Sequence, residues 1–204
     1  SYAKTLSDLQ KGNNQDGDCG NPLNEAPVWL DRTRFRRGQD FAMKNIGALL
    51  FSMYFSLAAG LSITNLLDPL VFTGKSDTPD KSFDRYKQTF IHVLSWFRED
   101  VWDTTSAGHA SLRQVRGIHA RVRDRINKQR PQTDHKFLSQ YDMALVQSGF
   151  MGGIVMYPST IIHCTIRELE DYVYFWRGIG YLLGIDDKYN MCVGNYSETF
   201  SLCK

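Results

Sequence analysis

The chain has 204 residues, with 24 Lys and Arg against 22 Asp and Glu, so its formal net charge is +2. This length suits one domain with a single core, and a content of 42% hydrophobic and 13% aromatic residues excludes a disordered chain. A net charge so close to zero gives no reason to expect a nucleic-acid partner. The four cysteines have no CxxC spacing, which argues against a structural zinc site.

The N-terminal part of the chain differs from the rest. Residues 11–27, "KGNNQDGDCGNPLNEAP", are rich in Gly, Asn, Asp and Pro and supply no apolar stripe. We therefore predict an extended N-terminal arm over residues 1–27 and a helical domain over residues 28–204. The first helix of that domain is expected near residues 27–45, with a basic polar face and apolar anchors at Trp29, Phe35 and Phe41.

Residues 46–64, "IGALLFSMYFSLAAGLSIT", lie in a stretch without charge between Lys44 and Asp68. Roughly 20 apolar residues can span a bilayer, so a membrane-spanning helix is one interpretation. The other is a fully buried core helix, which the interior Ser52, Ser56 and Gly60 and the absence of a second such segment favour. We adopt the core interpretation and expect no membrane partner.

A turn-rich linker over residues 73–82 precedes a helix predicted over residues 82–101. One side of this helix carries apolar residues at spacings of three and four. A second row of residues along the helix, next to the apolar one, carries polar or aromatic side chains: Arg85, Thr89, His92 and Trp96.

The next helix contains "VRGIHARVR", residues 115–123. Its expected apolar positions are Leu112, Val115, Val122 and Ile126. His119 occupies the gap between the two valines, so the pattern predicts that it faces the core. Arg116 and Arg123 stand three residues before and four residues after His119, which places both on the same side of the helix.

A core-facing histidine is most often a structural residue bonded to a carbonyl or a carboxylate. The flanking arginines favour a second interpretation, in which the helix faces an anionic group with a metal at its centre. Haem b has this form, because its iron accepts an imidazole nitrogen and its two propionates accept guanidinium groups. Zinc fits less well, since His92, His109, His135 and His163 show no ligand pairing.

Two further helices are expected, over residues 137–158 and 159–183, and Gly149, Gly152 and Gly153 in the first would allow a close approach of another helix. No run of alternating hydrophobicity predicts a strand. The sequence therefore predicts an all-α fold, a single helical domain.

Four segments carry a resemblance to a known family: "WLDRTRFRRGQDF", "RYKQT", "VRGIHARVR" and "YFWRGIGYLLGIDD". In order and spacing they resemble motifs of the rubber oxygenase (latex clearing protein) catalytic-domain family, which includes an ER-bound oxygenase of mycophenolic acid biosynthesis. "VRGIHARVR" is similar to the VR-x-x-H-A-x-V-R signature of this family. The resemblance runs from about Pro27 to Asp187.

The resemblance implies a haem b-dependent oxygenase that acts with dioxygen on a hydrophobic, isoprenoid-like substrate. It implies His119 as the proximal iron ligand, with Arg85 and Thr89 lining the haem pocket and Arg116 and Arg123 as propionate contacts. Gln88 stands where rubber oxygenases have a lysine. The resemblance therefore implies the haem-dependent oxygenase chemistry more strongly than it implies a rubber-like substrate. Gln88 or Thr89 is the predicted hydrogen-bond donor to dioxygen, and His92 is a possible sixth ligand.

The sequence leaves a second function open, a non-catalytic carrier of haem or a pigment that uses the same scaffold. The even number of cysteines and the sequon Asn195-Tyr196-Ser197 favour a secreted or ER-lumenal glycoprotein. Relatives continue beyond the position of Asp187, which leaves open a homo-oligomer whose second subunit completes the pocket wall.

Overall fold

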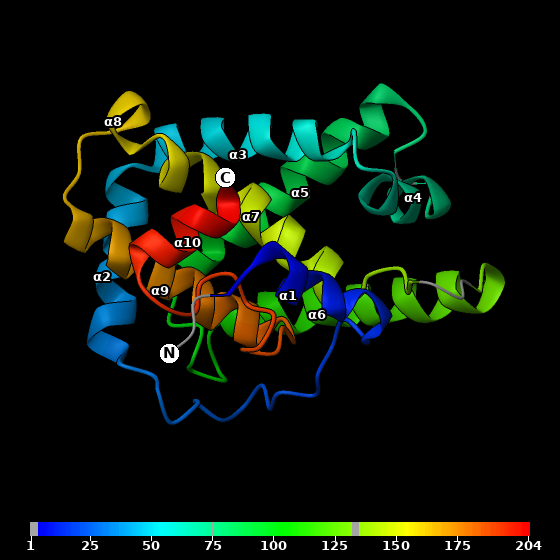
Figure 1. The fold of residues 1–204 in the computed structure, drawn as a ribbon, viewed down its shortest axis with the longest axis horizontal. Helices are drawn as coiled ribbons and strands as arrows, with labels where there is room; N and C mark the ends of the chain where they lie inside the picture. The colour runs from blue at the N-terminus through cyan, green and yellow to red at the C-terminus, as the bar shows by residue number, and fades with distance from the viewer. Residues whose placement is uncertain (1–3, 75, 132–134) are drawn as a thin grey trace.

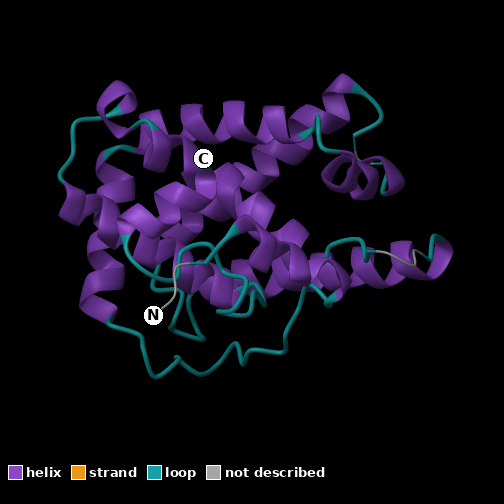
Figure 2. Cartoon of the chain, viewed as in Figure 1, coloured by secondary structure: helices purple, strands orange, loops and turns teal. Residues whose placement is uncertain are grey.

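A computed structural model describes residues 4–74, 76–131 and 135–204 of the chain. Within these ranges the protein is a single all-α domain without strands, which confirms the predicted fold class, and an isolated β-bridge joins Asp16 to Ser139 (Figure 2). The longer helices follow in chain order (Figure 1): α2 (Arg32–Lys44), α3 (Ile46–Gly60), α4 (Thr64–Phe72), α5 (Pro79–Arg98), α6 (Ala107–Gln129), α7 (Gln140–Met156), α9 (Ile166–Leu182) and α10 (Tyr196–Cys203).

The first half of the predicted extended arm contains helical turns instead. Within the described residues 4–27, α1 (Leu6–Gln10) is followed by a short 3-10 helix, η1 (Lys11–Asn14). Thr5 and Asp8 form a capping box at the start of α1, and Leu9 is fully buried. One buried apolar anchor and one capping box are therefore enough to order this segment, and the chain is irregular from residue 15 until α2 begins.

The centre of the domain is the packing of α2 against α9. On the outside of this pair, Arg34 and Arg37 both bind the buried carboxylate of Asp171, with Arg37 Nε at 2.6 Å from Oδ2. On the inside, the ring of Phe175 lies 4.9 Å from that of Phe35 and 5.3 Å from that of Phe97, centroid to centroid. An aromatic core thus joins α2, α5 and α9.

Helix α3 packs against α7 at small residues, as the glycines of α7 predict. A Cβ atom at Gly153 would stand 2.2 Å from Ser52 Oγ, and one at Gly149 would stand 3.2 Å from the side chain of Leu57. A larger residue at either position would have to displace these side chains of α3. The prediction of a fully buried core helix over residues 46–64 is wrong for the outer side of α3, because Phe51 and Phe55 are more than half exposed. The helix also ends earlier, at Gly60.

Among the described residues, no single helix has both the length and the apolar composition needed to cross a membrane. The bent pair α2 and α3 passes those criteria together, but its two helices meet at 87°. The four cysteines are free. The exposed Asn195 of the sequon caps α10 by accepting a hydrogen bond from the backbone N–H of Glu198 at 3.0 Å, while glycosylation and a secreted location stay predictions.

Helices α5 and α6 form an antiparallel hairpin. Ser111 of α6 accepts a hydrogen bond from Trp96 Nε1 at 2.9 Å and shares one with His92 Nδ1 at 2.7 Å, so the helices are in contact near their connection. Farther from it, α5 rises away from α6 and α4 lies at the open end (Figure 1). There Arg125 of α6 lies 5.4 Å from the ring centroid of Phe72, which ends α4.

Several helix boundaries differ from the prediction because local capping decides them. The helix predicted over residues 82–101 starts earlier, since Thr78 accepts a hydrogen bond from Lys81 N and Pro79 fits the first helical position. The helix predicted over residues 159–183 is divided into α8 (Pro158–Ile161) and α9, which Thr165 begins with a capping box. Helices α4 and α10 were not predicted.

Candidate functional site

The candidate site lies on the inward-facing line of α6. Leu112 and Ile126 are fully buried, and His119 stands seven residues from each of them, on nearly the same line of the helix. His119 therefore faces the interior, as its spacing predicts. Unlike the two apolar residues, His119 retains accessible surface, as do Val115 and Val122 beside it. Solvent therefore reaches α6 at the level of His119 more than at Leu112 or Ile126.

The imidazole of His119 has a buried nitrogen that nothing in the described chain satisfies. Its Nδ1 atom is inaccessible to solvent and has no hydrogen-bond partner. Burial lowers the pKa of His119 to about 4, an effect that the nearby Arg123 guanidinium increases and the Asp18 carboxylate opposes. The ring is consequently neutral at physiological pH, which is the form that binds a metal.

Arg85 lies on the side of α5 that faces α6. It belongs to the same helix line as His92 and Trp96, which contact Ser111 at the closed end of the hairpin. Measured from these contacts, Arg85 is about 10.5 Å away along α5 and His119 about 12 Å away along α6, at 1.5 Å per residue. The two residues thus lie at similar distances along their own helices from the contact at Ser111.

The guanidinium of Arg85 also lacks partners. Its Nε and Nη2 atoms are inaccessible and make no hydrogen bond within the described chain, and its Cζ atom lies 4.5 Å from the ring centroid of Tyr86. A buried cationic donor without an acceptor is costly unless an anion accompanies it. His119 of α6 and Arg85 of α5 therefore each carry buried polar atoms without a hydrogen-bond partner in the described chain.

The other two residues predicted on α5 have different surroundings. Thr89 is partly buried, and its hydroxyl donates to the backbone carbonyl of Arg85 at 3.0 Å, the ordinary arrangement for a helical threonine. The side chain of Gln88 is exposed and makes no hydrogen bond within the described residues. The role of Gln88 or Thr89 as a donor to dioxygen stays a prediction.

Arg116 and Arg123 share one side of α6, as predicted, and both bind carboxylates of the N-terminal arm. Arg116 Nε donates to Asp18 Oδ2 at 2.6 Å, its Nη2 donates to the other oxygen of the same carboxylate, and its Nη1 donates to two backbone carbonyls. Arg123 Nε lies 2.9 Å from Asp16 Oδ1. The contact of these arginines with haem propionates stays a prediction.

The remaining histidines have other surroundings. His92 is partly buried against Ser111, and burial lowers the pKa of its ring. His109 is buried and its Nδ1 donates to the Val101 carbonyl at 3.0 Å, so it closes the α5–α6 turn. His163 is exposed. Across the part of the chain that is described, no three His, Cys, Asp or Glu residues are grouped to hold a metal ion, so a metal bound here would need to arrive with ligands of its own.

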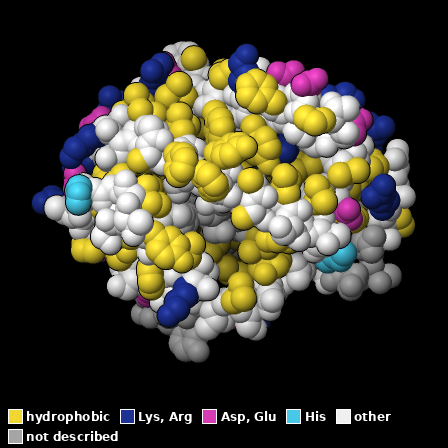
Figure 3. Space-filling view, turned by 90° about the horizontal axis from the view of Figure 1, so that it is seen from above, with side chains coloured by type: hydrophobic (Ala, Val, Ile, Leu, Met, Phe, Trp, Pro, Cys, Tyr) yellow, Lys and Arg dark blue, Asp and Glu magenta, His cyan; other side chains and the backbone are white. Residues whose placement is uncertain are grey.

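An apolar surface lies beside Arg85, and we call it the α3–α5 face. Hydrophobic side chains gather across it, with most Lys and Arg at its margin (Figure 3). Tyr54 of α3 and Tyr86 of α5 join it to Arg85, with ring centroids 6.2 Å apart. The exposed large apolar residues of α3 and α5 are Phe51, Tyr54, Phe55, Phe83 and Ile91.

Asp16 and Asp18 are the site residues that sequence reasoning missed. They belong to the segment "QDGDC", which has the composition of a solvated loop and shows no periodicity. The available signal was chemical: the buried sides of Arg116 and Arg123 required anions, and an acidic pair in the arm could supply them.

Comparison with protein families gives one match. The family model described as "ER-bound oxygenase mpaB/B'/Rubber oxygenase, catalytic domain" matches residues 43–193, which include α3 to α9 and therefore Arg85 and His119. No curated protein matches the chain, and no solved structure matches it.

Proposed function

Because the chain belongs to the family of ER-bound oxygenase and rubber oxygenase catalytic domains, we propose that it is a haem b-dependent oxygenase acting with dioxygen on a hydrophobic, isoprenoid-like substrate. Membership supports an oxidoreductase with an oxygenase catalytic domain; the haem, its ligand and the substrate are our proposal. The observation that carries it is the presence of unsatisfied buried atoms on both residues, Nδ1 of His119 on α6 and Nε and Nη2 of Arg85 on α5.

In this proposal His119 is the iron ligand. Its position on the inward line of α6 aims the ring toward the interior, and the lowered pKa keeps a nitrogen lone pair available at physiological pH. A single protein ligand suits haem, because the porphyrin supplies the four equatorial nitrogens. The absence of a clustered ligand set among the described residues is compatible with such a cofactor.

Arg85 would bind a propionate. A carboxylate near Nε and Nη2 would satisfy both buried donors at once, in the fork geometry that guanidinium groups favour. Arg116 has its donors engaged within the chain, whereas Arg123 binds a carboxylate that is itself half exposed. Of the two arginines predicted as propionate contacts, Arg123 therefore has the partner that exchanges more readily with solvent.

The α3–α5 face supports a hydrophobic substrate. When bound, haem supplies the activation of dioxygen. The chain contributes an uncharged surface that leads to Arg85 past Tyr54 and Tyr86, and apolar surfaces of this kind mark sites that bind apolar partners or ligands. A substrate bound there would displace water from the neighbourhood of the cofactor.

The proposal is tested by the visible spectrum of the purified protein, as isolated and after addition of hemin. We expect a Soret band that shifts when dithionite and carbon monoxide are added, and we expect His119→Ala to lose it. His92→Ala is the matched control, because His92 lies near the connection of α5 and α6 and its ring already bonds Ser111. Circular dichroism of each variant shows that the fold is retained.

Three outcomes decide the proposal. A carbon monoxide shift that depends on His119 supports it and leads to assays of isoprenoid cleavage. A Soret band that does not respond to carbon monoxide contradicts turnover and favours the non-catalytic carrier. A folded wild-type protein that takes up no hemin contradicts the haem assignment altogether.

A further inference from the structure

The arm crosses one side of α6 at the level of His119. Arg116 and Arg123 project from this side, and the arm supplies Asp18 to the first and Asp16 to the second. Because Arg116 precedes Arg123 whereas Asp18 follows Asp16, the arm runs antiparallel to α6 across the turn that carries His119. We call the two ion pairs the arm clamp.

The geometry of the clamp limits movement of α6. At 100° per residue, Arg116 and Arg123 lie about 20° apart around the helix, and they lie about 60° and about 40° from His119, respectively. The Asp18 carboxylate receives two hydrogen bonds from Arg116, and this bidentate pair fixes orientation as well as distance. A rotation or a sliding of α6 that turned His119 away from the interior would break both pairs of the clamp.

The arm is itself fixed to two other helices. The backbone N–H of Cys19 donates to the carbonyl of Gly184 after α9 at 2.9 Å, and Gln140 at the start of α7 donates through Nε2 to the carbonyls of Asp16 and Gly184 at 3.0 and 2.9 Å. Gly17 passes so close to Leu138 that a Cβ atom would stand 1.9 Å from its carbonyl oxygen. The clamp therefore ties α6 to both α7 and α9.

The clamp also sets the charge beside the histidine. Burial raises the pKa of the Asp18 carboxyl, but the hydrogen bonds from Arg116 and from the backbone N–H of Gly20, together with the charges of Arg116 and Arg123, outweigh this effect. The net pKa is lowered, so Asp18 is an anion. Two guanidinium groups one turn from His119 are thus balanced by two carboxylates. Without the carboxylates, the uncompensated positive charge would disfavour the ferric state of an iron bound at His119.

We propose that Asp16 and Asp18 are positioning residues, which hold His119 in its iron-binding orientation through Arg123 and Arg116 and balance the charge beside it. This role rests on the proposed function. The alternative is that the aspartates occupy arginines meant for propionates and so compete with haem. The two backbone carbonyls on Arg116 Nη1 argue against competition, because a propionate could not replace them.

The test compares Asp18→Asn, Asp16→Asn and the control Asp8→Asn in hemin titrations and in spectroelectrochemistry of the hemin-loaded protein. Asp8 is an aspartate of the same N-terminal region, and it pairs with Lys11 and caps α1. We expect Asp18→Asn to weaken hemin binding by about tenfold and to raise the midpoint potential. Asp16→Asn should act in the same direction with a smaller effect, since its carboxylate is half exposed, and Asp8→Asn should change neither quantity.

Asp18→Glu keeps the carboxylate, so we expect its hemin affinity and midpoint potential to lie between those of the wild type and of Asp18→Asn. If Asp18→Asn does not fold, Asp18→Glu and Asp16→Asn decide the test. Unchanged affinity and potential in folded clamp variants would overturn the positioning role alone. Tighter hemin binding in them would overturn it in favour of competition. A wild-type protein that binds no hemin would overturn the proposed function and the positioning role together.

Discussion

The two sides of α6 treat polar groups in opposite ways. On the side of the arm, Arg116 is nearly buried and uses its donors on a carboxylate and two carbonyls, all from within the chain. On the interior side, His119 Nδ1 and the Arg85 guanidinium are inaccessible and have no partner in the described chain. An unsatisfied buried polar group costs about 1–3 kcal/mol. Arg116 thus finds its partners within the fold, whereas His119 and Arg85 retain buried atoms without partners, to which our proposal assigns a ligand.

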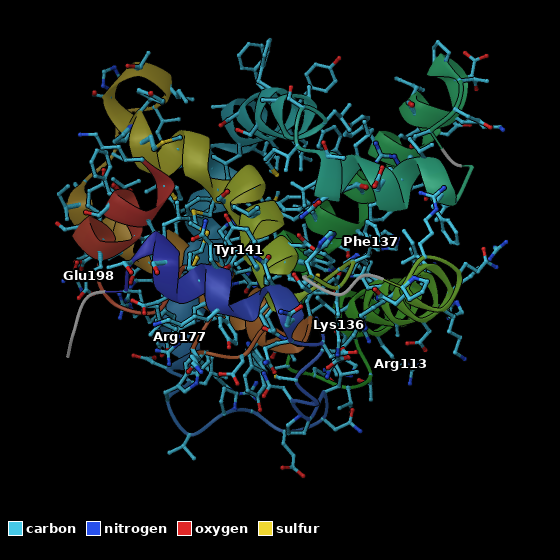
Figure 4. All side chains as sticks on the ribbon, turned by 45° about the vertical axis from the view of Figure 1, so that its right-hand side comes forward. Arg113, Lys136, Phe137, Tyr141, Arg177 and Glu198 are labelled. Carbon is cyan, nitrogen blue, oxygen red and sulfur yellow. The ribbon has the colours of Figure 1, made fainter. Side chains whose placement is uncertain are left out.

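The largest effect is expected on the arm side. Arg116→Met should lower the free energy of unfolding by about 3 kcal/mol, because it leaves the carboxylate of Asp18 largely buried and unpaired. Urea unfolding followed by circular dichroism measures this loss. Arg113→Met is the matched control, since Arg113 is exposed on the same helix and extends away from the domain (Figure 4). Equal stability of the two variants would contradict a structural role for the arm side.

On the interior side the opposite pattern is expected. Arg85→Met should leave the unfolding free energy of the haem-free protein unchanged or higher, because the buried Nε and Nη2 atoms have no hydrogen bond to lose and methionine can also pack against the ring of Tyr86. It should weaken hemin binding by roughly 10- to 150-fold, the equivalent of a lost hydrogen bond to a charged group. Hemin titration and urea unfolding of Lys87→Met, an exposed neighbour on α5, provide the control. A destabilised Arg85→Met protein with unchanged hemin affinity would reverse the comparison.

His119 should give the haem-free protein a pH-dependent stability. Its folded pKa of about 4 lies below the ordinary value of 6.5, so the unfolded chain takes up a proton that the folded chain excludes. The unfolding free energy should therefore fall as the pH decreases from about 6.5 to about 4, by at most about 1.4 kcal/mol per pH unit.

Urea unfolding at pH 7, 6 and 5 measures this slope in the wild type and in His119→Leu, which should lack the contribution. His163→Leu is the control, because His163 is exposed and should retain the wild-type slope. Parallel pH profiles for wild type and His119→Leu would show that the ring of His119 is not desolvated.

The smallest effect is expected at Thr89, whose hydroxyl already donates to its own helix. Thr89→Val should change the unfolding free energy by less than about 0.5 kcal/mol, since the backbone carbonyl of Arg85 keeps its helical position. Hemin affinity should stay within about twofold of wild type. A tenfold loss in the same titration would place Thr89 with Arg85 among the groups that contact the cofactor.

Much of this architecture could be predicted from the sequence. The three- and four-residue spacing of apolar side chains gave the existence of α2, α5, α6 and α7, and the position of His119 between Val115 and Val122 gave its inward direction. Helix ends were less predictable, because single side chains such as Thr78 and Thr165 decide them. The inward position of His119 followed from sequence because a buried line on a long helix repeats regularly.

The partners of the arginines could not be predicted in the same way. Asp18 and Arg116 are 98 residues apart, and no periodicity connects an irregular arm to a helix. The outer side of α3 was also predicted wrongly, because a helix that is apolar on all sides gives no direction to its buried face. Phe51 and Phe55 therefore showed their exposure only in the folded structure.

The most direct test of the central claim, that His119 binds the iron, is chemical rescue. His119→Gly removes the ring, and imidazole added to the solution can enter the space it leaves. We predict that the hemin-loaded variant loses the wild-type Soret spectrum and regains it when imidazole is added. A His119→Gly protein that keeps the wild-type spectrum without imidazole would contradict the claim.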